Sequence, residues 1–263
     1  MNNTSSEPTR GSSAVRPVRL LIAMYHSVDG RTGPADDPYG VTVAPDRLDR
    51  QLRALRDRGL RGVSVRELLA AARTGRARGL IGLTFDDGYA DFLDTAVPLL
   101  RRHDCTATVF VLPGLPGGTN DWDPLGPRKP LLTEAGVRAC AAAGMEVGSH
   151  GLRHRSLPAA DDAVLRAETE ESRALLREMT GAAPEGFCYP YGHLDARSVA
   201  AVRAAGYAYG CAIDPGALGG VHALPRVHVG QRDTGPRLAA KYLLHPLRRR
   251  PVVPAAAPVV RVP

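Results

Sequence analysis

The most constraining feature of this chain is an apolar run at residues 80–89 (LIGLTFDDGY) that ends in two adjacent carboxylates, Asp86 and Asp87. The apolar half predicts a buried strand, and its polar end would then open onto a site. Neighbouring Asp side chains repel each other and lose hydration on burial, so a cation is expected beside them. An Asx-capped turn is the alternative for an Asp-Asp-Gly triplet, and the pair alone leaves both open.

Two further segments point to the same chemistry. His150 and His154 lie four residues apart, so both rings can face one ion from a single turn of chain. With a carboxylate they supply a two-His, one-carboxylate set that leaves metal positions open for water and substrate. Residues 187–192 (FCYPYG) predict an aromatic strand end that turns at Pro and Gly, where a backbone N–H can face an oxyanion.

The motifs TFDDG, SHGLRH and PYG, in this order, resemble those of the polysaccharide deacetylase family, also called NodB-homology domains. These are metal-dependent carbohydrate esterases that remove N- or O-acetyl groups from sugars. The resemblance spans about residues 18–234. The segment MYHSV at 24–28 is similar to the opening strand of the branch that acts on poly-N-acetylglucosamine, and GMEVG at 144–148 leads into the His pair as in many members.

Strand and helix patterns alternate along the chain, which predicts an α/β architecture with a parallel sheet. Catalytic loops follow the C-terminal ends of such strands, and all three motifs occupy that position. The resemblance implies an irregular (β/α)7 barrel. The charges of the helix expected at 161–181 are interpreted as a solvated face. Strands are expected at 18–25, 80–85, 106–111, 145–149, 187–189 and 207–213, and helices from 45, after 64, through 99–100, and at 133–144, 161–181 and 195–206.

We expect one catalytic domain, at 18–234, between a disordered segment at 1–17 and a basic, Pro- and Ala-rich tail at 235–263. The tail carries six basic residues and no acid, so it accounts for +6 of the net charge of +7. The body is nearly neutral, and no nucleic-acid partner is expected. A solvated tail is the simplest interpretation, with weak contact to an anionic membrane surface or polymer as the alternative.

No stretch approaches the roughly 18 apolar residues of a membrane span. No signal peptide is visible, which favours a cytoplasmic location, with an extracellular or cell-surface location as the alternative. We expect a monomer. The four cysteines have no C-x-x-C spacing and predict buried free thiols, compatible with a reducing cytosol. They are Cys105, Cys140, Cys188 and Cys211.

The resemblance implies a role for each motif residue. Asp87, His150 and His154 match the family positions for metal binding, with Zn²⁺ as the expected ion and Co²⁺ or Ni²⁺ able to replace it. The ion would polarise the amide carbonyl and activate a water. Asp86 would be the general base that takes the proton of the water. The Tyr191 backbone N–H would stabilise the oxyanion.

A general acid is needed for the departing nitrogen, and the family usually supplies a late His oriented by an Asp. We expect His228 in this role, with His222 and His26 as alternatives and Asp214 as a partner. His26 is also a candidate substrate-binding residue because it lies at a predicted strand end.

Two departures from the family pattern concern the residues around the base. The Arg that often precedes the Pro-Tyr turn is replaced within 187–189, and no Asp-x-x-Asp-Trp segment follows Gly206. We expect Arg226 to substitute for the missing Arg, and it is also a candidate substrate-binding residue. Trp122, on the long connection at 112–132, is expected either to stack on a sugar or to pin its own loop, and Pro190 is a further substrate-contact candidate.

The sequence therefore predicts a metal-dependent deacetylase of N-acetylated amino sugars, in a glycan of the poly-N-acetylglucosamine, chitin or peptidoglycan type. A deacylase of a small N-acyl sugar, glycolipid or secondary-metabolite amide is one alternative. A non-catalytic carbohydrate-binding protein on the same fold is another. The presence of Asp86 together with a complete metal set argues against the last.

Overall fold

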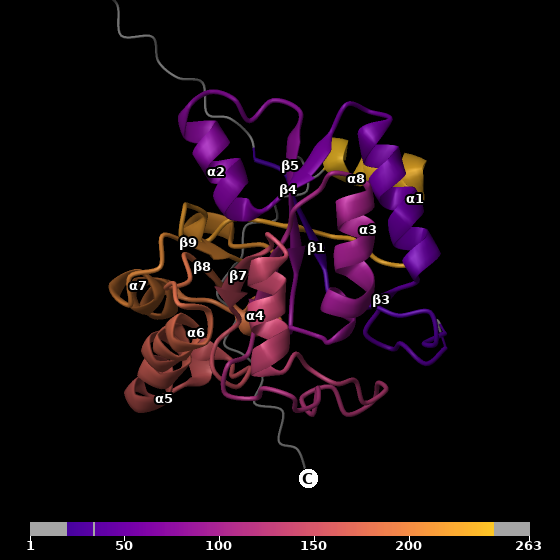
Figure 1. The fold of residues 1–263 in the computed structure, drawn as a ribbon. Helices are drawn as coiled ribbons and strands as arrows, with labels where there is room; N and C mark the ends of the chain where they lie inside the picture. Colours follow the sequence, from indigo (N-terminus) through magenta and orange to yellow (C-terminus); the bar gives the residue numbers. More distant parts are fainter. Residues whose placement is uncertain (1–19, 34, 245–263) are drawn as a thin grey trace, which may run out of the picture.

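The computed structural model describes residues 20–33 and 35–244, so the segment predicted to be disordered at 1–17 lies outside the described residues (Figure 1). One parallel sheet runs through the molecule in the order β10-β1-β5-β6-β7-β8-β9, and β4 pairs with the start of β5. A separate parallel pair is formed by β2 and β3. The strands are β1 (Ile22–Tyr25), β2 (Ser27–Val28), β3 (Thr42–Val43), β4 (Arg61–Val63), β5 (Leu80–Phe85), β6 (Thr108–Val111), β7 (Glu146–Ser149), β8 (Gly186–Cys188), β9 (Tyr209–Cys211) and β10 (Val227–His228).

The two ends of this sheet approach each other through the segment that precedes β10. Leu224 bridges Cys211 at the end of β9, and the Ala212 N–H donates to the Leu224 carbonyl at 2.8 Å. A few residues later, Val227 and His228 pair with β1. The sheet is therefore a curved, partly closed barrel, which confirms the predicted α/β barrel.

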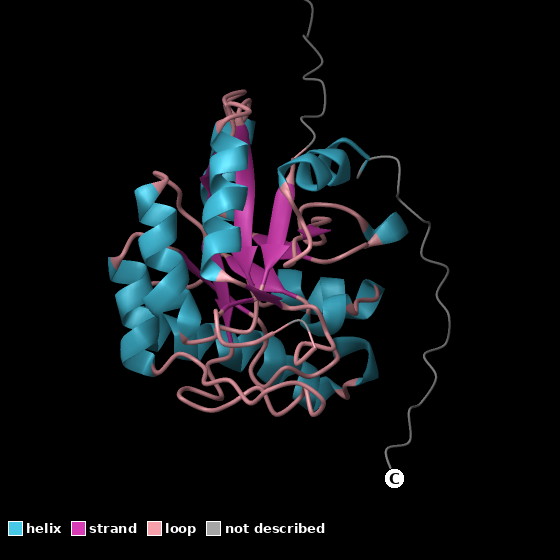
Figure 2. Ribbon diagram, turned by 90° about the vertical axis from the view of Figure 1, so that its right-hand side faces the viewer, coloured by secondary structure: helices cyan, strands magenta, loops and turns pink. Residues whose placement is uncertain are grey.

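Helices cover the outside of the sheet. In Figure 1 α1, α3 and α8 lie side by side, while α5, α6 and α7 lie on the other side of the molecule. Figure 2 shows the longer loops gathered at one end of the sheet. The α-helices are α1 (Pro45–Arg56), α2 (Val65–Arg73), α3 (Val97–Arg102), α4 (Glu134–Ala142), α5 (Asp162–Arg166), α6 (Ser172–Thr180), α7 (Ala196–Ala204) and α8 (Gly235–Leu244).

Helix α1 illustrates how apolar spacing fixes this arrangement. Pro45 occupies its first turn, where the missing N–H costs nothing. Leu48, Leu52 and Leu55 follow at helical spacing and are all buried against the sheet and α3. Each buried leucine contributes roughly 1.5–3 kcal/mol of transfer free energy. This burial holds the helix on the barrel, as the sequence predicted.

The long helix predicted at 161–181 is helical from Asp162 to Thr180, but its middle is a π-helical stretch, Ala167–Glu171. The wider turn rotates Glu168 inward, and this side chain is buried. The interpretation of all the charges on this helix as a solvated face is therefore wrong at Glu168. The helical periodicity of the sequence did not predict the burial of Glu168, because a π-helical turn changes which of the following positions face inward.

The predicted tail begins with an ordered helix rather than a solvated segment. Helix α8 packs against α1 and buries Leu238. Its Lys241 ammonium donates to the Asp233 carboxylate at 2.6 Å and to the His228 carbonyl at 2.9 Å. The folded body thus extends at least to residue 244, and residues 245–263 of the tail lie outside the described residues. Within the described ranges no helix is long and apolar enough to cross a membrane.

Candidate active site

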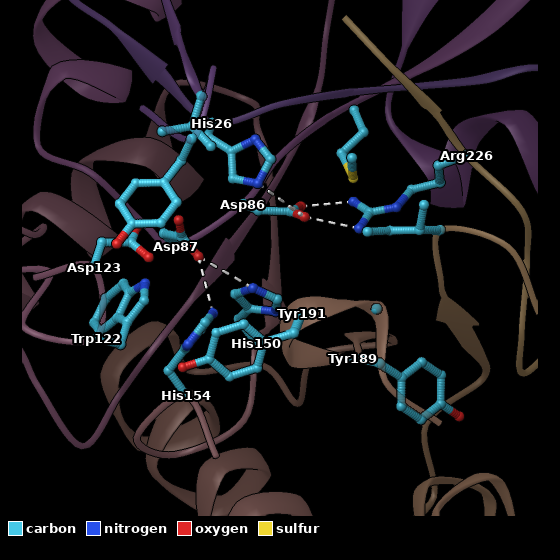
Figure 3. A pocket seen from close by; sticks show the side chains of 15 residues that line it. His26, Asp86, Asp87, Trp122, Asp123, His150, His154, Tyr189, Tyr191 and Arg226 are labelled. Atoms are coloured by element: carbon cyan, nitrogen blue, oxygen red, sulfur yellow. Dashed lines mark hydrogen bonds and ion pairs between the residues drawn. The ribbon is translucent and has the colours of Figure 1, made fainter. Parts of the chain in front are cut away.

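Asp86 and Asp87 leave the end of β5 in opposite directions. The Asp86 N–H donates to the Tyr25 carbonyl at 2.9 Å, which continues the pairing of β5 with β1 by one residue. Asp87 then adopts a positive φ of 71°, a conformation uncommon outside glycine. Both carboxylates are buried. This backbone turn sends Asp86 toward β10 and Asp87 toward the His pair (Figure 3).

Asp87, His150 and His154 converge on one point. The Nε2 atoms of His150 and His154 lie 3.2 and 3.4 Å from the same Asp87 oxygen, Oδ1. His150 follows β7 directly, and His154 has a positive φ of 61° that turns its ring back toward the first. The structure therefore brings together the three residues that the sequence predicted as ligands.

The donor chemistry of this set fits a divalent cation. The His150 Nδ1–H donates to the Cys188 carbonyl at 2.9 Å, so in the neutral ring Nε2 presents a lone pair to the Asp87 carboxylate. A lone pair facing a carboxylate is repulsive unless a proton or a metal ion lies between them. Burial raises the pKa of Asp87, but when the Nε2 atoms of His150 and His154 carry a proton, their contacts outweigh burial and hold that pKa well below its usual range. The carboxylate is thus ready to bind a cation.

Asp86 is paired with Arg226, as the sequence predicted. The guanidinium donates through Nη1 to Oδ1 at 2.6 Å and through Nη2 to Oδ2 at 2.7 Å. Arg226 also donates to the Ala212 carbonyl at 3.1 Å and to Thr84 Oγ1 at 2.9 Å, so the buried fork is fixed on both sides. Burial raises the pKa of Asp86, but the Arg226 charge outweighs it and lowers the pKa below its ordinary value. The carboxylate is held ionised.

Cys188, which stands shortly before the Pro-Tyr turn, packs against the pair formed by Arg226 and Asp86. All four cysteines are buried and free, as predicted. The Cys188 thiol lies 3.0 Å from Arg226 Nη2 and 3.5 Å from Asp86 Oδ2. A small side chain on β8 therefore leaves room for an arginine that enters from the segment before β10.

The pocket above these residues contains His26 but not the predicted acid, His228. His26 Nε2 lies 4.0 Å from Asp86 Oδ2. The His228 ring lies 6.2 Å from the His26 ring between centroids and is not part of the pocket lining, and His222 is turned aside to contact the Tyr207 carbonyl at 2.9 Å. The pocket is lined by Met24, His26, Tyr39, Val41, Asp86, Asp87, Trp122, Asp123, His150, His154, Tyr189, Tyr191, Gly192, Ile213 and Arg226.

His228 fails as the pocket histidine because of strand direction. Its Cα pairs with that of Met24 on β1, whereas His26 follows the end of β1, two residues further toward the mouth of the barrel. Sequence order alone could not show which of the two rings reaches the opening.

The turn at residues 190–192 forms another wall. Tyr191 has φ 59° and ψ 3°, a left-handed conformation, and its half-exposed ring meets the edge of His154 at 4.4 Å between centroids. Pro190 begins this turn but is buried beneath it and does not line the pocket. Asp87, His154 and Tyr191 thus all have positive φ, and each such residue costs on the order of 1–3 kcal/mol.

Trp122 packs on one histidine of the pair and also lines the pocket, so its stacking on a sugar stays a prediction. Its ring stacks on His154, with centroids 4.5 Å apart and planes 22° apart, and it also lines the pocket. Its loop meets a second loop, where the Leu125 N–H donates to the Tyr39 hydroxyl at 3.3 Å. Tyr39 carried no signal in the sequence, because only the tertiary contact between the two loops brings it to the site.

Glu168 holds the loop between the two histidines, and sequence reasoning missed it. Its carboxylate accepts from the backbone N–H groups of Leu152 at 2.7 Å and Arg153 at 3.1 Å. Gly151, with φ 82°, passes so close that a Cβ there would lie 2.4 Å from a Glu168 oxygen. A side chain at position 151 would therefore displace the Glu168 carboxylate, which we call the clamp of this loop. The only available signal was an acid in an otherwise helical pattern.

The parallel barrel, the buried carboxylate held by arginine and the two-His, one-carboxylate set together define a carbohydrate esterase of the deacetylase class. The chain belongs to the polysaccharide deacetylase family, whose model matches residues 74–210, slightly more than half of the sequence. It is 26% identical over 230 residues to the polysaccharide deacetylase homologue YxkH of Bacillus subtilis (strain 168), a match that covers 86% of this chain and 76% of that protein.

Solved structures share the fold. The Streptococcus pyogenes deacetylase PplD in complex with acetate superimposes with a TM-score of 0.74 and 24% identity, covering 86% of this chain and 99% of that one. IcaB from Ammonifex degensii gives a TM-score of 0.68 and 24% identity, covering 84% of this chain and 95% of that one.

Proposed function

We propose that this protein is a metal-dependent deacetylase that removes N-acetyl groups from N-acetylated amino sugars of a glycan. The observation that carries the proposal is the meeting, in one pocket, of the Asp87, His150 and His154 set with the Asp86 and Arg226 pair. Family membership supplies the deacetylase chemistry. Buried ion pairs seldom stabilise a fold. A buried carboxylate kept ionised by an equally buried arginine is therefore not expected in a binding protein without activity.

Asp87, His150 and His154 would hold the ion, with zinc as our choice among divalent metals for this nitrogen and oxygen set. When bound, the ion polarises the acetyl carbonyl and lowers the pKa of an attacking water. Asp86 takes the proton of that water, since Arg226 keeps the carboxylate ionised and aimed into the pocket. The Tyr191 backbone N–H stabilises the oxyanion.

The general acid is His26 in this proposal, rather than His228. A proton donor must lie within reach of the departing nitrogen, and of these two rings only His26 lines the pocket. His26 and the His pair lie on opposite sides of Asp86 (Figure 3). A substrate amide placed between His26 and the His pair would therefore present its nitrogen to His26.

Acetate release tests the proposal directly. The zinc-loaded protein is expected to release acetate from N-acetylglucosamine oligomers, more slowly from monomeric N-acetyl sugars, and not at all after removal of the metal. A rate that rises with oligomer length supports a glycan substrate. A rate highest on a monomeric N-acyl sugar would instead favour the small-molecule deacylase. Absence of release from every N-acetyl sugar, with the metal bound, would refute the proposal.

A further inference from the structure

Three carboxylates line the pocket, and two of them have charged or hydrogen-bonding neighbours. Asp86 is paired with Arg226, and Asp87 faces the two histidines. Asp123 also lines the pocket, yet within residues 20–33 and 35–244 its carboxylate makes no hydrogen bond or ion pair. Asp121, two residues earlier, points outward and pairs with Arg128 at 2.8 Å. Asp123 is therefore the one pocket carboxylate left for a ligand among the described residues.

The loop that carries Asp123 is fixed from several sides. The Asn120 side-chain oxygen accepts from the Lys129 N–H at 2.7 Å, which closes the base of the loop. The buried Lys129 ammonium then donates to Ser27 Oγ at 2.6 Å, next to His26 in the chain. The contact of Trp122 with His154 holds the tip. The carboxylate is thus preorganised without a partner of its own, which lowers the entropic cost of binding a ligand.

The surroundings of Asp123 favour a cation over a neutral hydroxyl. Asp123 is only partly exposed, and its carboxylate has no cation paired with it among the described residues. A hydroxyl group would leave this negative charge in place, whereas an ammonium group would neutralise it. Trp122 lies beside the carboxylate (Figure 3), and Tyr39 lines the same pocket, so two aromatic rings are available to a sugar.

We propose that Asp123 is a subsite for the protonated amine of a glucosamine unit, so that the pocket prefers glycans in which a sugar near the reacting N-acetyl group is already de-N-acetylated. The inference deepens the proposed function and rests on it for the identity of the reaction. Binding of an amino-sugar oligomer can nevertheless be measured without turnover, so the two ideas can fail separately.

The experiment compares the zinc-loaded wild-type protein with Asp123→Asn and with Asp121→Asn as the matched control from the same loop. Calorimetry measures binding of a fully de-N-acetylated glucosamine oligomer. A hydrogen bond between charged groups in a partly buried site changes affinity by about tenfold. We expect Asp123→Asn to bind about tenfold more weakly and Asp121→Asn to bind like wild type. Added salt should weaken binding to wild type more than to Asp123→Asn.

Turnover supplies the second readout. Per acetyl group, wild type and Asp121→Asn should show a higher kcat/KM on partly de-N-acetylated oligomers than on fully acetylated ones, and Asp123→Asn should lose that preference. Equal binding of the amine oligomer by wild type and Asp123→Asn would overturn the inference. So would a loss of zinc and of rate on all glycans alike in Asp123→Asn, because Asp123 would then serve the metal. Amine binding that depends on Asp123, without any acetate release, would support the subsite and refute the proposed function.

Discussion

Arg226 clamps Asp86 through two parallel hydrogen bonds of 2.6 and 2.7 Å, although the two residues lie 140 positions apart. The pair stands beside the ligand set without belonging to it. Arg226 therefore fixes the position of the proposed base and contributes most to keeping it ionised, so substitutions can test the base and the ligands separately.

Asp86→Asn should keep zinc but lower kcat by ~10²–10⁴, the range for loss of a general base. The amide cannot take a proton, while the Asp87 contacts to both histidines remain. Acetate release and metal content measured on the same preparation check this. Asp46→Asn, an exposed partner of Arg50 in α1, is the control and should match wild type. An active Asp86→Asn enzyme would refute the assignment.

His150→Ala and His154→Ala should each contain less than stoichiometric zinc after dialysis, because each substitution removes one of the two histidines that complete the ligand set with Asp87. Elemental analysis measures the metal content. His193→Ala is the matched control, since that ring contacts Ser156 away from the ligand set. Full zinc occupancy in both site variants would remove these residues as ligands.

His26→Ala should lower kcat by ~10²–10⁴ through loss of the proton donor. His228→Ala should keep most of the rate, since its ring is not part of the pocket lining. Steady-state kinetics on an N-acetylglucosamine oligomer, with zinc content as the control, separates the two. The reverse order of effects would return the acid role to His228.

Glu168→Gln should weaken zinc affinity about 10–100-fold, the usual effect of disturbing groups that orient ligands. The amide would set an N–H against the N–H groups of Leu152 and Arg153, between the two ligand histidines. Competition with a chelator measures the affinity. Glu171→Gln, exposed at the end of the same π-helical stretch, should leave it unchanged. Equal affinities in both variants would show that the clamp does not position the ligands.

Asp49→Asn should lower the free energy of unfolding at pH 7 by about 1 kcal/mol, the value of a partly buried charged hydrogen bond. Asp49 contacts His103 at 2.9 Å, and this hydrogen bond, ahead of an opposing desolvation effect, lowers the pKa of Asp49. A lowered folded pKa gives stability that is present above the unfolded pKa of ~3.9 and is lost as the pH falls through the folded value. Urea unfolding should therefore show the wild-type advantage shrinking below about pH 4. A difference that is independent of pH would contradict this account.

The sequence by itself determined the elements that depend on short spacing. The Leu48, Leu52 and Leu55 stripe placed α1, and the apolar run before Asp86 placed β5. His150 and His154 lie in one short segment, so their convergence follows from local geometry together with a strand end. The motif order identified the family, since it depends on chain order alone.

Tertiary structure decided whatever depends on contacts between distant segments. The proposal of His26 rather than His228 as the acid rests on which of the two rings lines the pocket, and this depends on the pairing of β10 with β1. The inward orientation of Glu168 arises from a π-helical stretch, which the hydrophobic periodicity of the sequence does not predict. Tyr39 and Asp123 reached the pocket only because two loops meet there. Local patterns specify which face of an element is apolar, but side chains from different strands and loops come together only when the barrel closes.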